Sequence, residues 1–155
     1  MNTQIIDLLI SHHQIHVRSV PYNDDLCVWR DVNIEQGAIL HPNYLVFDPL
    51  PDDSFGANVH INVTDTFNID PKSQRCISAP FTITHRDDVE VASVSESFKV
   101  TVPLSAALYT VYFEVCEGDE IFYKITFVPT TKQHEATYVI DDILGAEKGT
   151  VLVKE

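Results

Sequence analysis

The sequence predicts an all-β protein, an antiparallel two-sheet β-sandwich with one or two short helices. Apolar and polar residues alternate with a period of two along several short segments, which is typical of strands with one face in water. Turn-forming residues separate these segments, and helix signals are few. With 155 residues, the chain is expected to form a single domain over residues 1–155.

The first alternating segment covers residues 10–18, which we predict to be one strand. The face expected to line the core holds Ser11, His13, Ile15 and Val17. The other face is expected in solvent and includes His12 and His16. Residues 58–64 repeat the pattern and predict a second strand.

Five more strands are expected at residues 76–84, 89–94, 98–102, 108–116 and 121–128. Pro80 interrupts the first of them, which favours an edge position or a bulge because proline has no N–H to donate. Residues 117–120 form a turn between the last two strands, which predicts a hairpin. The predicted core includes Val59, Ile61, Val63, Val100, Val102, Val111, Phe113 and Val115.

Helices are expected at few places. Residues 31–37 begin with Asp31 in a capping position and end at Gly37, which predicts one or two helical turns. Residues 140–146 are a candidate short terminal helix, and residues 3–9 are compatible with a helix or a strand. Residues 42–55 are rich in proline and acids, which predicts a surface loop.

The charge of the chain is strongly negative. It has 23 acidic and 10 basic side chains, a formal net charge of −13. This charge repels phosphates and argues against direct nucleic-acid binding, whereas it attracts a basic partner. The imbalance is largest in residues 1–71, where ten acids face two bases, Arg18 and Arg30.

Many of the acids lie in expected turns. The candidate partner-binding residues are Asp24, Asp25, Asp48, Asp52, Asp53, Asp87 and Asp88. Two interpretations stay open. Either the acids simply follow from the preference of turns for aspartate and from the solubility that an acidic surface gives, or they form a surface that binds a basic groove. A third use of the three acids within residues 42–55 is calcium coordination, although the spacing of an EF-hand loop is missing.

The three cysteines, Cys27, Cys76 and Cys116, have apolar neighbours and spacings that match no metal or redox motif. We expect buried free thiols, a reducing compartment and hence a cytoplasmic protein. The N-terminus lacks a signal-peptide pattern, and no apolar stretch approaches the roughly 18 residues of a membrane span.

Neither catalysis nor a cofactor is expected. Motifs for nucleotide binding, serine hydrolysis and zinc proteolysis are missing, and apolar flanks argue against a cysteine nucleophile. His12, His13 and His16 resemble a metal-ligand set. On one strand, however, His12 and His16 would lie ~13 Å apart and His13 would point away, so no metal is expected. We interpret His13 as a core residue and the others as solvent histidines.

Six short motifs follow one another through the chain: I-S-H-H-Q-I-H-V at 10–17, V-W-R-D at 28–31, I-E-Q-G at 34–37, A-P-F-T-I at 79–83, F-K-V-T-V-P at 98–103 and Y-T-V-Y-F at 109–113. Their order and spacing resemble the competence protein J family, small bacterial inhibitors of a DNA-entry nuclease. The resemblance covers roughly residues 10–117. It departs from the family pattern at residues 103–109, which lack the glycine expected before Tyr109.

The resemblance implies a protein that binds and blocks a nonspecific, metal-dependent DNA nuclease and does no chemistry itself. The acids would then take the place of DNA phosphates in a basic groove. We assign Trp29 to the core, with an interface role as the alternative.

Other functions stay open. An immunity protein against a toxin nuclease would use the same physics. A sandwich that binds sugars or lipids would use exposed aromatics, for which the candidates are Tyr112, Phe122 and Phe127. An enzyme is the remaining class.

Overall fold

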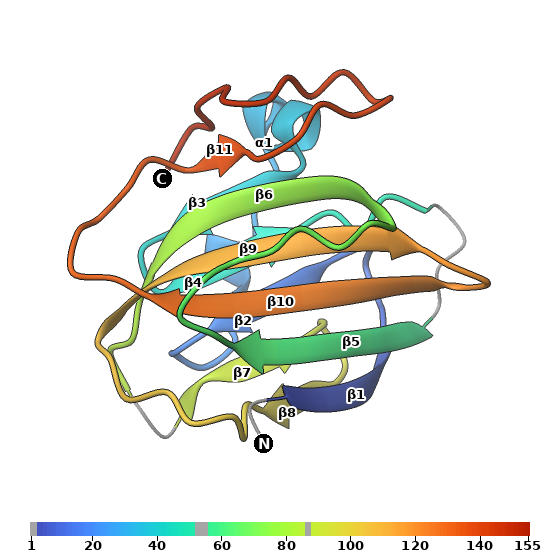
Figure 1. The fold of residues 1–155 in the computed structure, drawn as a ribbon. Helices are drawn as coiled ribbons and strands as arrows, with labels where there is room; N and C mark the ends of the chain where they lie inside the picture. The colour runs from blue at the N-terminus through green and yellow to red at the C-terminus, as the bar shows by residue number, and fades with distance from the viewer. Residues whose placement is uncertain (1–2, 52–55, 86–87) are drawn as a thin grey trace.

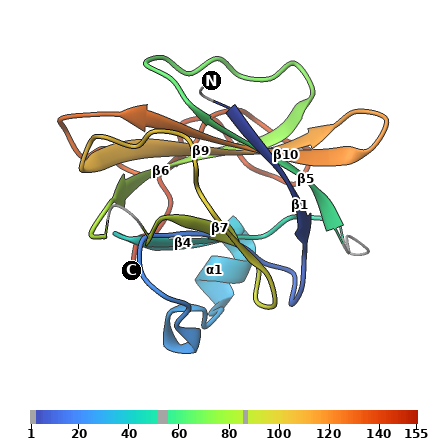
Figure 2. The ribbon, with the colours of Figure 1, turned by 90° about the horizontal axis from the view of Figure 1, so that it is seen from below.

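Two β-sheets lie face to face and enclose the core (Figures 1 and 2). The computed structural model describes residues 3–51, 56–85 and 88–155. Within these ranges the chain forms eleven strands, one short α-helix and one 3-10 helix. The predicted all-β sandwich with one or two short helices is confirmed.

The larger sheet has six strands in the order β1-β5-β10-β9-β6-β11. Their bounds are β1 Thr3–Leu9, β5 Gly56–Val63, β6 Ser73–Thr82, β9 Leu108–Glu117, β10 Ile121–Pro129 and β11 Thr137–Tyr138. β9 and β10 form the predicted hairpin. One pair departs from the antiparallel pattern, since β5 and β10 run parallel. Parallel neighbours need a long connection, and here the chain forms β6 to β9 between them.

The smaller sheet has five strands in the order β3-β4-β2-β7-β8. Their bounds are β2 Ile15–Arg18, β3 Ala38–His41, β4 Tyr44–Phe47, β7 Glu90–Ala92 and β8 Ser97–Lys99. The 3-10 helix η1 (Asp24–Leu26) and the helix α1 (Asp31–Gln36) precede β3. Figure 2 shows α1 on the outer side of this smaller sheet.

The core lies between the inner faces of the two sheets. Six of the eight predicted core residues are buried, and Val63 and Val100 are partly buried against them. Phe113 on β9 is fully buried and stacks on Phe47 of β4, with ring centroids 4.3 Å apart. This contact joins the two sheets directly, so the inward positions of the alternating pattern are the ones that fill the sandwich.

Residues 10–18 are not one strand, contrary to the prediction. The chain turns at His12 and His13, which have φ of 53° and 56°, and this turn leads from β1 in one sheet to β2 in the other. His13 therefore lies in an exposed turn, not in the core. His16 lies opposite the core as expected, but it is fully buried because residues 20–29 cover that face. Both assignments of these histidines are wrong.

The expected helices have mixed outcomes. The helix predicted at 31–37 is α1, but the residue at its N-cap is Arg30 and not the predicted Asp31. The backbone N–H of Arg30 donates to Asn33 Oδ1 at 3.0 Å, and Gly37 ends the helix at φ 83°. Residues 3–9 are extended and form β1. Residues 140–146 form turns in place of the predicted helix, because the Asp142 side chain accepts hydrogen bonds from the N–H groups of Leu144 and Ala146.

Pro80 lies within β6, opposite Thr110 of β9. On the other side of β6, β11 pairs only with Ile77 and Ser78, so Pro80 faces an unpaired edge. The register shift of β6 lies between Ser73 and Arg75, away from the proline.

All three cysteines are free and buried, as predicted. Burial raises the pKa of each thiol, to about 12 for Cys116. A raised pKa keeps a thiol protonated and unreactive. Neither helix in the described part of the chain has the length and apolar character of a membrane-spanning segment.

Candidate interaction surface

Residues 20–36 cross the outer face of the smaller sheet and carry the candidate site. η1 follows Asn23, whose side-chain oxygen accepts a hydrogen bond from the N–H of Asp25 at 3.0 Å. A second, smaller core anchors this segment, and it consists of Cys27, Ile39, Tyr44 and Val46, with Val20, Leu26 and Trp29 packed against it. This packing holds η1 and α1 on the sheet while their polar sides face solvent.

His16 lies beneath this segment as a neutral ring. Burial, with the charge of Arg18, lowers the pKa of His16 to about 4. Its Nδ1 lies 2.9 Å from Arg18 Nη1, and its Nε2 lies 2.7 Å from Gln14 Oε1. A guanidinium can only donate, so Nδ1 accepts and Nε2 carries the proton that is donated to Gln14.

The geometry around Cys27 does not form a nucleophile–base pair. Its Sγ lies 3.9 Å from His16 Nε2, but this nitrogen carries a proton and has no lone pair for the thiol proton. The thiol donates instead to the carbonyl oxygen of Asn23 at 3.4 Å. We therefore assign this cluster a structural role.

Four exposed carboxylates follow one another along η1 and α1, and we call them the acidic ridge: Asp24, Asp25, Asp31 and Glu35. The two cations of residues 1–71 do not offset this charge. Arg18 is buried and pairs with Glu90, and Arg30 pairs with Glu155. The ridge therefore projects its negative charge into solvent.

The structure places the predicted acids in different regions. Asp24 and Asp25 lie on the acidic ridge. Asp48 lies near the end of α1, because its N–H donates to the carbonyl oxygen of Gly37 at 3.0 Å. Asp88 precedes β7, far along the smaller sheet from β3, and its carboxylate lies 3.9 Å from Lys99 Nζ. The other three, Asp52, Asp53 and Asp87, lie outside the described residues.

A hollow of about 290 Å³ opens between the histidine turn and α1. We call it the Trp29 hollow, and it is lined by His12, His13, Trp29, Ile34 and Asp48. Trp29 is half-buried, so its assignment to the core holds only for the part that packs on the smaller core. Nε2 of His13 lies 2.9 Å from Oδ1 of Asp48.

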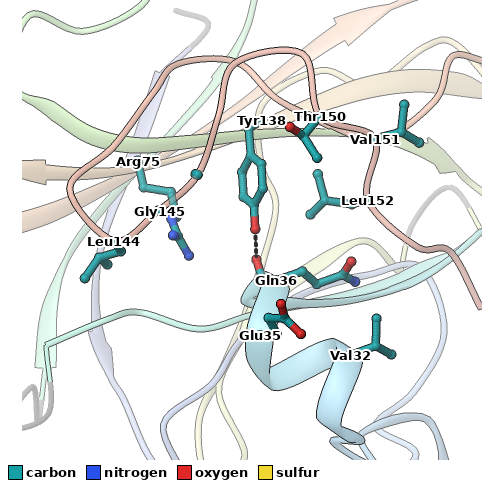
Figure 3. A pocket seen from close by; sticks show the side chains of 11 residues that line it. Val32, Glu35, Gln36, Arg75, Tyr138, Leu144, Gly145, Thr150, Val151 and Leu152 are labelled. Carbon is teal, nitrogen blue, oxygen red and sulfur yellow. Dashed lines mark hydrogen bonds between the residues drawn. The ribbon is translucent and has the colours of Figure 1, made fainter.

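A second hollow, of about 510 Å³, lies between α1 and the C-terminal segment (Figure 3). The hydroxyl of Tyr138 donates to the carbonyl oxygen of Gln36 across it, at 2.8 Å. Arg75 lines the hollow, but Asp142 neutralises its guanidinium through contacts of 2.8 and 3.3 Å. Because the charge of Arg75 is already paired, we assign this hollow a structural role. The contacts around it hold the C-terminal segment against the sandwich.

The three aromatic side chains proposed for a sugar or lipid site do not share one exposed surface. Phe127 is fully buried in the core, so its predicted exposure is wrong. Tyr112 stacks on Phe67 with centroids 3.9 Å apart, and Phe122 packs beside His60. In the described parts of the chain, no three His, Cys, Asp or Glu side chains converge as metal ligands.

Three residues of this surface, Asp31, Glu35 and Ile34, are not among the predicted partner-binding residues. Asp31 and Glu35 have i, i+4 spacing within the predicted helix, a signal that would have placed both on one helix face. Ile34 is 62% exposed between them. Ile34 follows Asp31 by three residues, so the same helical spacing places it on this face, and the structure shows that this face points to solvent.

The sequence pattern of the family described as Competence protein J (ComJ) matches residues 7–128. This chain belongs to the competence protein J family. Both the acidic ridge and the Trp29 hollow lie in the matched range, whereas β11 and the tail follow it.

A solved member of the family has a similar fold. It is the crystal structure of ComJ, inhibitor of the DNA degrading activity of NucA, from Bacillus subtilis. The TM-score is 0.66 at 18% sequence identity, and the match covers 82% of this chain and 96% of that one. A search of curated protein sequences finds no match.

Proposed function

We propose that this competence protein J family chain is a non-catalytic inhibitor that binds and blocks a basic, DNA-degrading nuclease in the cytoplasm. The observation that carries the proposal is the acidic ridge on a chain of this family, with both nearby arginines already paired. Bacillus subtilis ComJ is described as an inhibitor of the DNA-degrading activity of NucA. An acidic surface competes with DNA for a basic groove.

The proposed inhibition needs no chemistry by this chain. The Cys27 thiol lies near the His16 ring, but Nε2 of His16 carries a proton and cannot act as a base for this thiol. The three thiols are buried with raised pKa values, which suits a stable reduced protein. Binding alone therefore supplies the proposed activity.

Charge reversal on the ridge tests the proposal. Single exposed ion pairs contribute ~0.2–1 kcal/mol, so we change Asp24 and Asp25 together to lysine. The variant should associate with the cognate nuclease several-fold more slowly than wild type at low salt, and the difference should shrink at high salt. Inhibition titrations and stopped-flow association at two ionic strengths measure this.

The matched control reverses Asp119 and Glu120, an exposed acidic pair in the turn between β9 and β10 of the other sheet. This control carries the same change in net charge and should associate almost as fast as wild type. Equal slowing by both reversals would show a general charge effect and would refute a binding site at the ridge. Reversals of Asp52 with Asp53, and of Asp87 with Asp88, test the remaining candidates in the same assay.

A further inference from the structure

The Trp29 hollow is a preformed cavity beside the acidic ridge. Its apolar wall comes from the exposed side of Trp29 and from Ile34, which is 62% exposed on α1. Trp29 cannot swing away freely, because it also packs against the smaller core. Tryptophan is enriched among the few residues that carry most of the binding energy at protein interfaces, and a tryptophan beside a cavity can form such a contact when a partner fills the cavity.

Unusual backbone conformations gather at this hollow. Among the described non-glycine residues, positive φ occurs at His12, His13 and Leu50. The two histidines line the hollow, and the N–H of Leu50 donates to Oδ1 of Asp48, which also lines it. A two-residue turn with positive φ at both positions favours Asn and Gly, so the histidine pair is a locally unfavourable choice. Backbone strain of this kind clusters at functional sites.

The hollow also holds an incompletely used carboxylate. Oδ1 of Asp48 takes both contacts, from His13 Nε2 at 2.9 Å and from the N–H of Leu50 at 2.8 Å. Oδ2 accepts no hydrogen bond from the described residues. The described residues that line the cavity include no lysine or arginine, and they offer an aromatic face, an aliphatic wall and an acceptor.

We propose that the Trp29 hollow receives one arginine side chain from the partner nuclease. The guanidinium plane stacks on the Trp29 indole and donates to Asp48 Oδ2, while the aliphatic stem packs against Ile34. The acidic ridge attracts the basic partner, and the hollow then fixes its position. This inference rests on the proposed function and names the anchor of the same interface.

A fluorine label on the sole tryptophan tests occupancy of the hollow. Protein labelled with 5-fluorotryptophan gives one ¹⁹F NMR signal, from Trp29. Addition of the cognate nuclease should shift this signal. If the nuclease binds and is inhibited but the signal does not move, the hollow is not the anchor. If wild type neither binds nor inhibits, the proposed function fails and this inference fails with it.

Variants separate the anchor from general charge. Asp48→Asn keeps an oxygen that accepts from the N–H of Leu50. It should weaken nuclease binding roughly 10- to 100-fold, because the proposed charge pair between Asp48 and the arginine of the nuclease is lost from the interface. The control Asp119→Asn makes the same chemical change at an exposed acid between β9 and β10 of the other sheet, and it should leave binding unchanged within about twofold. Ile34→Gln changes an exposed residue, so folding is preserved, and should weaken binding several-fold.

Salt dependence gives the last comparison. The effect of Asp48→Asn should persist at high salt, since contacts shielded from water are screened little. Wild-type affinity in both Asp48→Asn and Ile34→Gln would overturn the proposal. A loss in Asp48→Asn that vanishes at high salt would also overturn it, because Asp48 would then be one more ridge charge.

Discussion

At the scale of single residues, His16 makes folding sensitive to acid. Its pKa in the folded protein is about 4, against 6.5 for an ordinary histidine, because it is buried beside Arg18. Between these two values the unfolded chain binds a proton that the folded protein does not. The contribution of His16 to the free energy of unfolding is therefore highest above pH 6.5. It decreases as the pH falls towards 4, by roughly 3 kcal/mol in total.

Urea unfolding between pH 7.5 and pH 4.5 measures this loss. Wild type should lose stability steadily below pH 6.5, and His16→Gln should show a much flatter profile. Glu114 acts in the opposite sense, because burial raises its pKa, but it is present in both proteins and cancels in the comparison. Parallel profiles for the two proteins would contradict the assignment of a neutral, buried His16.

At the scale of elements, residues 130–155, which we call the tail and which include β11, hold α1 and β3 against the larger sheet. β11 adds to the edge of β6, and the Tyr138 hydroxyl donates to Gln36 at the end of α1. The Gln36 amide then donates to and accepts from the backbone of Val153, at 3.0 and 2.9 Å. The tail thus stabilises the helix that carries half of the acidic ridge.

The turn of this tail depends on one ion pair. Burial alone would raise the pKa of Asp142, but the hydrogen bonds and charge of Arg75 outweigh burial and lower it. Asp142→Ala should therefore cost about 3–5 kcal/mol, because it leaves the buried Arg75 without a counter-charge. Denaturant unfolding measures the cost.

The double variant Arg75→Met, Asp142→Ala is the control for that prediction. It removes both charges, and it should be more stable than Asp142→Ala alone, since no unpaired charge remains buried. If the double variant is the less stable of the two, the cost comes from the lost hydrogen bonds to Leu144 and Ala146 and not from the charge.

At the scale of the whole molecule, we propose that residues 1–155 unfold as one domain. Ala136, Tyr138, Ala146 and Leu152 of the tail are buried in the same core as both sheets. Scanning calorimetry should show one transition, with equal calorimetric and van't Hoff enthalpies. A separate low-temperature transition for the tail would contradict a single domain.

Local patterns predict some strand pairings and turns of this fold better than others. β9 and β10 follow their predicted ranges closely, because each residue pair in a hairpin is close in sequence and the alternation is unbroken. The histidine turn was missed because His-His lacks the Asn-Gly signal of such turns. The parallel pairing of β5 with β10 was also missed, since it joins segments about sixty residues apart by register that no local pattern contains.

The sequence by itself determined the all-β class, the negative charge, the buried thiols and the family resemblance, because composition and periodic patterns are local properties of the chain. Only the tertiary structure decided where the charges and histidines lie. Arg18 pairs with Glu90 and Arg30 pairs with Glu155, so neither arginine neutralises the acidic ridge. Residues 20–29 cover His16 and bury it. The Trp29 hollow forms from three separate stretches of chain, so its existence depends on contacts between residues distant in sequence.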